Sequence, residues 1–362
     1  MIGITGTNGK TTTTRLVARM ARAAGRVPGI TSSDGVAVDE QLVHPGDFSG
    51  PEGTRLVLRH PGVEIAILET ARGGILRRGL TVERCDAALI TNVSADHLGD
   101  YGIDDVALMA RVKAVVARDA GTVILNADDP ALVAIAPAFA NVVWFSREPR
   151  PGIAWTVRDG QLVHGDRTLV AIDQIPITFG GHATYNLENA LAGAALAHAL
   201  GLPDDAIVAG LRSFTSSSED NPGRGNVFDV GGVTVLLDFG HNPAAIRAVM
   251  ALAKSLTRGA LRVTIGMPGD RLDGELRKLA QEIAAGNPAQ VIVRELSADL
   301  LRGRAPGTIP EVIAAGLRDH GVANVALAAS EVEAVQRLLG AAHPGDLVLV
   351  LTHLDPAVRA LL

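Results

Sequence analysis

Cysteine is almost absent from the sequence, with Cys85 the only one in 362 residues. A disulfide framework and a zinc site built from cysteines are therefore excluded, and a cytoplasmic protein is expected. No apolar run reaches the ~18–20 residues that a membrane span needs. No basic stretch precedes the first apolar segment, so no signal peptide is predicted. The formal net charge of −6 argues against a nucleic-acid-binding protein, because such proteins usually carry a basic surface.

Lysine is the second scarce residue. Only four of the 33 basic side chains are lysines, namely Lys10, Lys113, Lys254 and Lys278. Arginine supplies the rest of the positive charge. A lysine in an apolar setting therefore needs a chemical reason that arginine could not meet.

The residues that are abundant indicate an ordinary globular protein, with 47% hydrophobic and 20% charged residues. Short apolar runs alternate with amphipathic stretches from end to end, which predicts an α/β fold with mainly parallel strands. The segment 213–225, rich in Ser, Gly, Asn and acidic residues, is typical of a linker. We therefore expect two domains, residues 1–215 and 226–362, joined by a linker at 216–225. The expected strands are Ile2–Thr5, Glu64–Leu68, Ala87–Thr91 and Thr122–Leu125, then Val233–Leu237, Arg262–Ile265, Gln290–Arg294 and Leu347–Leu351.

The first strand runs directly into a glycine-rich loop and an amphipathic helix that ends near Gly25. Glycines let a loop turn its N–H groups and the helix N-terminus toward a polyphosphate. The strict Walker pattern has a glycine where this chain has Ile4, and a plain glycine turn before a helix is the alternative. Because lysine is scarce, the pattern Gly-x-x-Gly-Lys-Thr would rarely arise by chance, which favours phosphate binding. The predicted phosphate-binding residues are Gly6, Thr7, Asn8, Gly9, Lys10, Thr11 and Thr12. Lys10 would contact the terminal phosphates, and the Thr11 hydroxyl would bind Mg²⁺.

Two further metal ligands are predicted at the ends of neighbouring strands. Glu69 ends the second expected strand, and His97 follows the third. Ligands of open α/β sheets bind beyond the carboxyl ends of the strands, and a lone Glu with a hydroxyl suits Mg²⁺. His97 would bind a second metal. The alternatives are a capping glutamate and a structural loop histidine.

Lys113 falls on the apolar face of a helix expected over Asp104–Asp119. A desolvated amine has a depressed pKa and is partly neutral, and a neutral amine can react with CO₂ to form an anionic carbamate. A lysine that is ion-paired or extends its amine to water is the alternative, and physical reasoning alone favours that alternative.

A second polar set suits the rest of a nucleotide. Asn186 and Asn189 lie three residues apart at the start of an alanine-rich helix, so they could present two amides to an adenine, or cap the helix and face water. Arg224 can bind phosphate, and Asp238, at a strand end, can bind ribose hydroxyls.

The order of these elements resembles the Mur ligase superfamily, and the resemblance covers nearly the whole chain. Within it, the chain is most similar to the C-terminal ligase module of cyanophycin synthetase. Three stretches carry that similarity: Ser33–Val36 with Gly46–Pro51, Glu69–Leu80 (ETARGGILRRGL), and Gly269–Arg271. The resemblance implies a P-loop central ATPase domain followed by a smaller Rossmann-like domain.

The resemblance also implies an ATP-dependent, ADP-forming ligase that makes an amide through an acyl phosphate. Lys10 and Thr11 would hold phosphates and Mg²⁺, and Glu69 and His97 would hold two metals. Lys113 matches a lysine that many members carbamylate. Asn189 matches an adenine contact, and Arg224 and Asp238 would contact ATP from the second domain.

The substrates are less well defined. Cyanophycin synthetase suggests an arginine-like amine and an aspartate-type acid. Arg72 is the residue we expect at the carboxylate, ahead of Arg77 or Arg78. Tyr185 replaces the usual histidine of the family, so the purine pocket is expected to differ. The phosphate loop begins within ten residues of Met1, so a partner protein or a second copy is expected to supply the missing N-terminal half. A folylpolyglutamate-synthase-like ligase and an inactive nucleotide-binding subunit are the alternatives.

Overall fold

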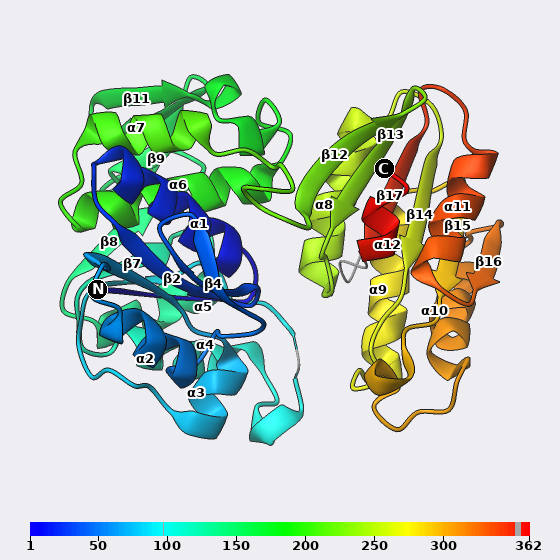
Figure 1. Ribbon diagram of the computed structural model, residues 1–362, viewed down its shortest axis with the longest axis horizontal. Helices are drawn as coiled ribbons and strands as arrows, with labels where there is room; N and C mark the ends of the chain where they lie inside the picture. Colours follow the sequence, from blue (N-terminus) through cyan, green and yellow to red (C-terminus); the bar gives the residue numbers. More distant parts are fainter. Residues whose placement is uncertain (97, 352–355) are drawn as a thin grey trace. The chain divides into compact units, whose positions relative to one another are not determined.

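The structure, a computed structural model, describes residues 1–96, 98–351 and 356–362. The chain divides into two compact units, Met1–Thr215 and Ser216–Leu362. Each unit has its own sheet and its own helices (Figure 1). No helix in the described part of the chain is both long and apolar enough to cross a membrane.

The first unit is built on an eleven-stranded sheet with the order β11-β10-β9-β8-β7-β6-β1-β5-β2-β3-β4. The strands from β9 to β2 in this order run parallel, and antiparallel hairpins extend the sheet at both edges. The strands are β1 (Ile2–Thr5), β2 (Pro28–Ser32), β3 (Gly35–Val38), β4 (Gln41–Pro45), β5 (Ile65–Glu69), β6 (Cys85–Ile90), β7 (Ala120–Asn126), β8 (Val142–Phe145), β9 (Trp155–Arg158), β10 (Gln161–His164) and β11 (Arg167–Ala171).

Helices cover both faces of this sheet (Figure 1). Each face of the sheet has its own hydrophobic core, and alternate residues of a buried strand point into one core or the other. Ala87 and Leu89 of β6 pack with α1, α6 and α7, whereas Ala88 and Ile90 pack with α4 and α5. The helices are α1 (Lys10–Ala23), α2 (Pro51–Arg59), α3 (Arg72–Arg78), α4 (Val106–Ala114), α5 (Pro130–Ile135), α6 (Thr184–Ala199) and α7 (Asp204–Ser213). Such two-sided burial explains why these strands read as continuous apolar runs.

The second unit has a six-stranded sheet with the order β12-β13-β17-β14-β15-β16, parallel except for β12. Its strands are β12 (Arg224–Val230), β13 (Val233–Asp238), β14 (Leu261–Ile265), β15 (Gln290–Arg294), β16 (Val325–Ala328) and β17 (Leu347–Leu351). Its helices are α8 (Pro243–Leu256), α9 (Asp273–Ala285), α10 (Thr308–Asp319), α11 (Glu331–Ala341) and α12 (Pro356–Arg359). The predicted α/β class with mainly parallel sheets is confirmed.

Some expected boundaries differ from those of the structure. Arg224 and Gly225, which the sequence placed in the linker, are the first residues of β12. The helix expected over 104–119 starts at Val106, because the Asp105 side chain caps it by accepting from the Leu108 N–H. It tightens into a 3₁₀ turn over Val115–Ala117. Helix ends commonly tighten in this way.

Candidate active site

The phosphate loop begins where β1 leaves the sheet. Gly6 has a φ of 150° and Gly9, the residue before α1, has a φ of 83°. A β-carbon on Gly6 would lie 1.9 Å from Thr91 Oγ1, and one on Gly9 would lie 2.1 Å from Asn189 Oδ1. Both positions therefore require glycine. The residue in place of the usual first glycine, Ile4, lies inside β1 and is fully buried, so the loop starts two residues later.

Segment 91–94, which follows β6, lies against this loop. The main-chain N–H of Thr7 donates to Asn92 O at 2.8 Å. The N–H of Ser94 donates to Thr7 Oγ1 at 3.0 Å. Asp129 in turn accepts from the N–H of Val93 at 2.6 Å while it caps α5. The ends of β1, β6 and β7 are thereby joined into one framework.

Two of the four lysines meet in this framework. Lys10 Nζ donates to Gly6 O at 3.1 Å and to Thr7 O at 2.9 Å. Lys113 Nζ, 4% exposed, donates to the same Gly6 O at 2.8 Å. Burial, reinforced by the positive charge of Lys10, lowers the pKa of Lys113 to about 7. The Lys113 amine is therefore partly neutral near pH 7, as its place on the apolar face predicts.

A carboxylate lies beside the first turn of α1. Thr11 Oγ1 donates to Glu69 Oε2 at 2.9 Å, and Glu69 is 2% exposed. Ser33 Oγ lies 3.3 Å from Thr11 Oγ1. The turn that carries Ser33 is attached to α1 by an ion pair of 3.0 Å between Arg15 of α1 and Asp34. Three oxygen-bearing side chains thus gather at this point, although the sequence predicted only two.

This oxygen cluster suits a cation that takes few protein ligands. No group of three or more His, Cys, Asp and Glu side chains that could hold a metal occurs in the described ranges. A cation here would therefore complete its shell with phosphate oxygens and water, as Mg²⁺ usually does. His97, the predicted ligand of a second metal, lies outside the described residues.

Two of the three arginines of α3 contact the segment after position 97. Arg72 Nη2 donates to Asp100 Oδ2 at 2.8 Å, and the Arg72 side chain is only 13% exposed. Arg77 Nε donates to Tyr101 Oη at 2.7 Å. Arg78 lies 3.9 Å from Glu52, and both side chains are exposed. Arg72, the residue expected at a substrate carboxylate, thus holds a carboxylate of its own chain.

The paired asparagines do not face water. Asn186 and Asn189 are 2% and 4% exposed. Asn189 Nδ2 donates to Asn186 Oδ1 at 3.1 Å, and Thr13 Oγ1 donates to Asn189 Oδ1 at 3.4 Å. Asn186 Nδ2 donates to Ile177 O at 2.9 Å. The alternative of a helix cap with a polar surface residue is therefore wrong, and Asn189 lies against the phosphate loop at Gly9.

A titratable group that the sequence did not single out lies next to Asn189. Burial raises the pKa of Glu188 to about 7, although Arg147 Nε lies 2.9 Å from its carboxylate. Asp128 and Asp129 raise that pKa further through their negative charge. Only the fold could reveal this group, because Glu188 lies far in the sequence from Asp128 and Asp129.

In the second unit, two predicted nucleotide residues lie opposite each other in a ladder. Arg224 of β12 pairs with Asp238 of β13, and the Arg224 guanidinium stacks 4.7 Å from the ring centre of Phe239. Asp238 Oδ1 accepts from the Gly240 N–H at 2.8 Å. Burial raises the pKa of Asp238 to about 6, against the lowering effect of Arg224. This pair lies at the carboxyl end of β13, where α/β sheets bind ligands.

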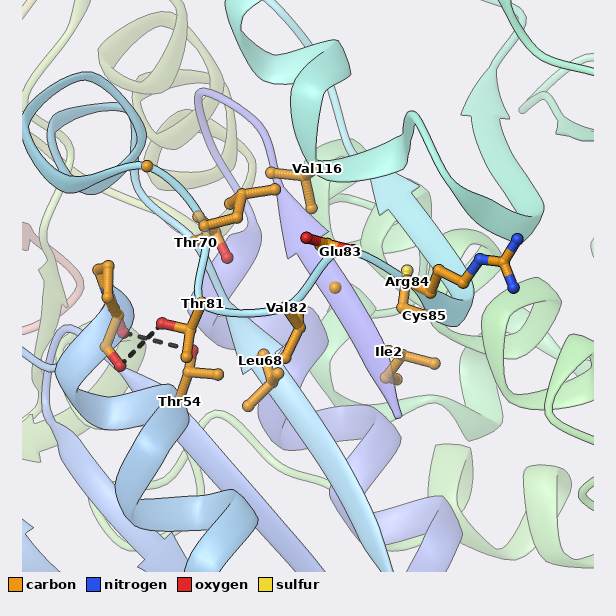
Figure 2. Close-up of a pocket in the computed structure, with 15 residues that line it drawn as sticks. Ile2, Thr54, Leu68, Thr70, Thr81, Val82, Glu83, Arg84, Cys85 and Val116 are labelled. Atoms are coloured by element: carbon orange, nitrogen blue, oxygen red, sulfur yellow. Dashed lines mark hydrogen bonds between the residues drawn. The ribbon is translucent and has the colours of Figure 1, made fainter.

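A cavity of about 30 Å³ borders the loop after β5 (Figure 2). Gly50, Pro51, Thr70 and Cys85 line it, and Thr81 Oγ1 donates to Pro51 O at 3.1 Å across one side. Burial raises the pKa of the Cys85 thiol. A space of this size holds about two water molecules, so it is not a substrate pocket.

The structure therefore gathers Gly6 to Thr12, Glu69, Lys113 and Asn189 at one edge of the first sheet. Arg224 and Asp238 belong to the second unit. A glycine-rich loop at a helix N-terminus, a lysine and a carboxylate can together hold a polyphosphate with its cation.

Comparisons with known proteins agree with this arrangement. The Mur ligase middle domain matches residues 4–197, and the Mur ligase glutamate ligase domain matches residues 223–353. Cyanophycin synthetase of Synechocystis sp. is 40% identical over 97% of the chain, which spans only 42% of that protein. UDP-N-acetylmuramyl-tripeptide synthetase of Deinococcus radiodurans is 28% identical over 97% of the chain and 72% of that protein. E. coli FolC in complex with ADP, 22% identical, has a TM-score of 0.76 over 99% of this chain and 89% of that chain, a similarity of fold alone.

Proposed function

The chain belongs to the Mur ligase family, and we propose that it is an ATP-dependent, ADP-forming ligase that joins a carboxylic acid to an amine. The observation that carries this proposal is the pairing of Thr11 with Glu69 beside the phosphate loop. A hydroxyl and a buried carboxylate next to free helix amides suit a magnesium nucleotide.

The second half of the loop and the residues around it have distinct roles in this proposal. The amides from Gly9 onward bind the phosphates, and Lys10 leaves the Gly6 and Thr7 carbonyls to contact the terminal phosphate. Thr11 and Glu69 would hold one Mg²⁺ and His97 a second metal, and these ions would neutralise charge on the phosphoryl oxygens when bound. Asn189, Arg224 and Asp238 keep the nucleotide contacts that the resemblance assigns to them.

The chemistry then has two steps. An oxygen of the acid attacks the γ-phosphorus, the bond to the β–γ bridging oxygen breaks, and an acyl phosphate and ADP result. The amine nitrogen then attacks the acyl carbon, the carbon–oxygen bond to phosphate breaks, and the amine loses a proton to give the amide. Arg72 would orient the acid, because a guanidinium fork matches a carboxylate. The protein contributes mainly position and charge neutralisation.

Lys113 fits a carbamate in this scheme. Its partly neutral amine would attack CO₂, form a nitrogen–carbon bond and release one proton. The resulting anion would replace a cation next to Lys10 and supply a further oxygen ligand for a metal. We propose this modification on the burial of Lys113 and its bond to Gly6 O.

The cyanophycin synthetases given above support a proposal for the substrates. Because cyanophycin synthetases are about 40% identical, we propose an arginine-like amine and an aspartate-type acid. The chain spans less than half of those proteins, so their whole activity does not transfer to it. The FolC fold keeps a folylpolyglutamate-synthase-like ligase as the alternative.

The test is an assay of ADP and phosphate release by the purified chain with a panel of small acids and amino acids. We expect release that depends on both an acid and an amine, with aspartate-type acids and arginine among the active pairs. Release only with folate-type acids and glutamate supports the alternative. ATP binding without release under every pairing, while the relatives turn over in the same assay, would falsify the ligase proposal.

Two expectations from the sequence stay predictions. One is a partner protein or second copy at the acid site, which the mass of the active species in solution can check. The other is a cytoplasmic location.

A further inference from the structure

The main chain of Asn8, in the phosphate loop, is held by side chains from outside the loop. Asn8 O accepts from Thr91 Oγ1 at 2.6 Å and from Asn92 Nδ2 at 3.1 Å. The N–H of Asn8 donates to Asn92 Oδ1 at 3.0 Å. The Asn92 amide thus binds both main-chain polar groups of Asn8, and the buried Thr91 hydroxyl adds a third bond.

These bonds fix the direction of the next N–H group. The C=O and N–H of a trans peptide point to opposite sides. Because Asn8 O faces Thr91 and Asn92, the N–H of Gly9 faces away from them. No acceptor in the described part of the chain binds the N–H of Gly9, Lys10 or Thr11. The first amides of a helix are the groups that bind an anion.

The Asn8–Gly9 peptide would be easy to rotate without these bonds. Gly9 has a φ of 83°, and glycine alone adopts positive and negative φ with similar ease. Glycine cannot be replaced here, since a β-carbon would lie 2.1 Å from Asn189 Oδ1. A rotated peptide would turn the partial negative charge of Asn8 O toward the phosphates, where it repels them.

The same bonds limit which amides can bind phosphate. The N–H groups of Thr7 and Asn8 are already bound, to Asn92 O and Asn92 Oδ1. Phosphate binding by main-chain amides therefore starts at Gly9. The segment that carries Thr91 and Asn92 is itself fixed by Asp129, which accepts from the Val93 N–H.

We propose that Thr91 and Asn92 are positioning residues that hold the Asn8–Gly9 peptide in its phosphate-binding orientation. This proposal rests on the proposed binding of ATP at the loop. Neither side chain needs to touch the nucleotide. Their effect is that the N–H donor of Gly9, and not the C=O acceptor of Asn8, faces the phosphates.

The test compares Mg-ADP affinity by calorimetry in the full chain and in Thr91→Val and Asn92→Ala. Each variant loses a hydrogen bond to Asn8 O, and we expect about tenfold weaker binding. Thr91→Ser keeps the hydroxyl and should restore affinity. Thr178→Val is the matched control, because the buried Thr178 hydroxyl donates to Ile172 O and Ile175 O, away from the loop. Its affinity should stay within about twofold of the parent.

A direct readout is the amide proton of Gly9 in protein labelled with ¹⁵N-glycine. It should shift on addition of Mg-ADP in the parent and shift less in Thr91→Val. Unchanged affinity in folded Thr91→Val and Asn92→Ala overturns the proposal, as does an equal loss in Thr178→Val. If Asn92→Ala does not fold, Asn92→Ser replaces it. A parent chain that binds no Mg-ADP contradicts the proposed function instead, so the two failures are distinguishable.

Discussion

Lys10 and Lys113 donate to the same acceptor, the carbonyl oxygen of Gly6, at 3.1 and 2.8 Å. Two ammonium groups on one oxygen repel each other, and Lys113 is the one that lacks contact with water. The structure therefore favours a Lys113 that loses its proton near pH 7.

Lys113 should make stability depend on pH. Its pKa is about 7 in the folded chain against 10.5 for an ordinary lysine. The unfolded chain therefore binds more protons between these values, so stability rises with pH from about 7 to 10.5. The gain between pH 7 and 9 is roughly 2 kcal/mol. We expect Lys113→Met to lack this rise, as measured by urea unfolding of both proteins at several pH values. Parallel pH curves would contradict the assignment.

Carbamylation of Lys113 makes a chemical prediction. Lys113→Ala should lower ligase turnover on the order of 10²-fold, because an anion at the metal is lost. Small carboxylates such as acetate should restore part of the activity by filling the gap. The measurement is turnover with and without added carboxylate. Full activity in Lys113→Arg excludes a carbamate, since arginine cannot form one.

Lys10 should matter for turnover and little for stability. Lys10→Ala removes a loop side chain whose bonds are to Gly6 O and Thr7 O, so the core stays intact. We expect ADP release to fall by about 10²-fold or more, with a melting temperature close to that of the parent. The control is Lys254→Ala, which removes an exposed lysine of α8 in the second unit. Parent-like release in Lys10→Ala would refute the role.

The ion pair between Arg72 and Asp100 predicts an effect on acid binding. If Arg72 binds the substrate carboxylate, Asp100 competes with the acid for it. Asp100→Asn should then lower the KM for the acid by several-fold, and Arg72→Ala should raise it, with little change in the KM for ATP. Arg158→Ala is the control, because Arg158 is an exposed arginine at the end of β9 with no assigned role. A KM for the acid that is unaffected in Arg72→Ala points to another residue.

Much of the frame could be predicted from the sequence, because strands buried on both faces read as apolar runs. Ile2–Thr5 is predicted to the residue, and the strand expected over Glu64–Leu68 runs over Ile65–Glu69. The shift is of one residue, and the main-chain N–H groups of Glu64 and Ile65 both donate to Val27 O at the start of the strand. Glu69 is the last residue of β5 and is buried.

The contacts that lie between distant segments could not be predicted. Ser33 reaches Thr11 only because Arg15 binds Asp34 and holds the turn on α1. Helical spacing showed that Asn186 and Asn189 share a face, but not that this face is buried. Their burial follows from close packing of α6 on α1, where Gly193 leaves room for Leu16. Such packing depends on three-dimensional shape, which the spacing of residues along the sequence does not reveal.

The central place of β1 has a consequence for synthesis and folding. Its two neighbours are β5, where Ile2 pairs with Ile67, and β6, where Ile2 pairs with Ala87. During translation, β1 leaves the ribosome before either neighbour, gains one partner when β5 has been made and has both edges paired only once β6 has followed. Contacts this distant in sequence slow folding, so the phosphate loop takes shape only after Thr91 and Asn92 have followed it. A chain interrupted before that point carries the complete glycine-rich sequence without the segment that holds it in shape.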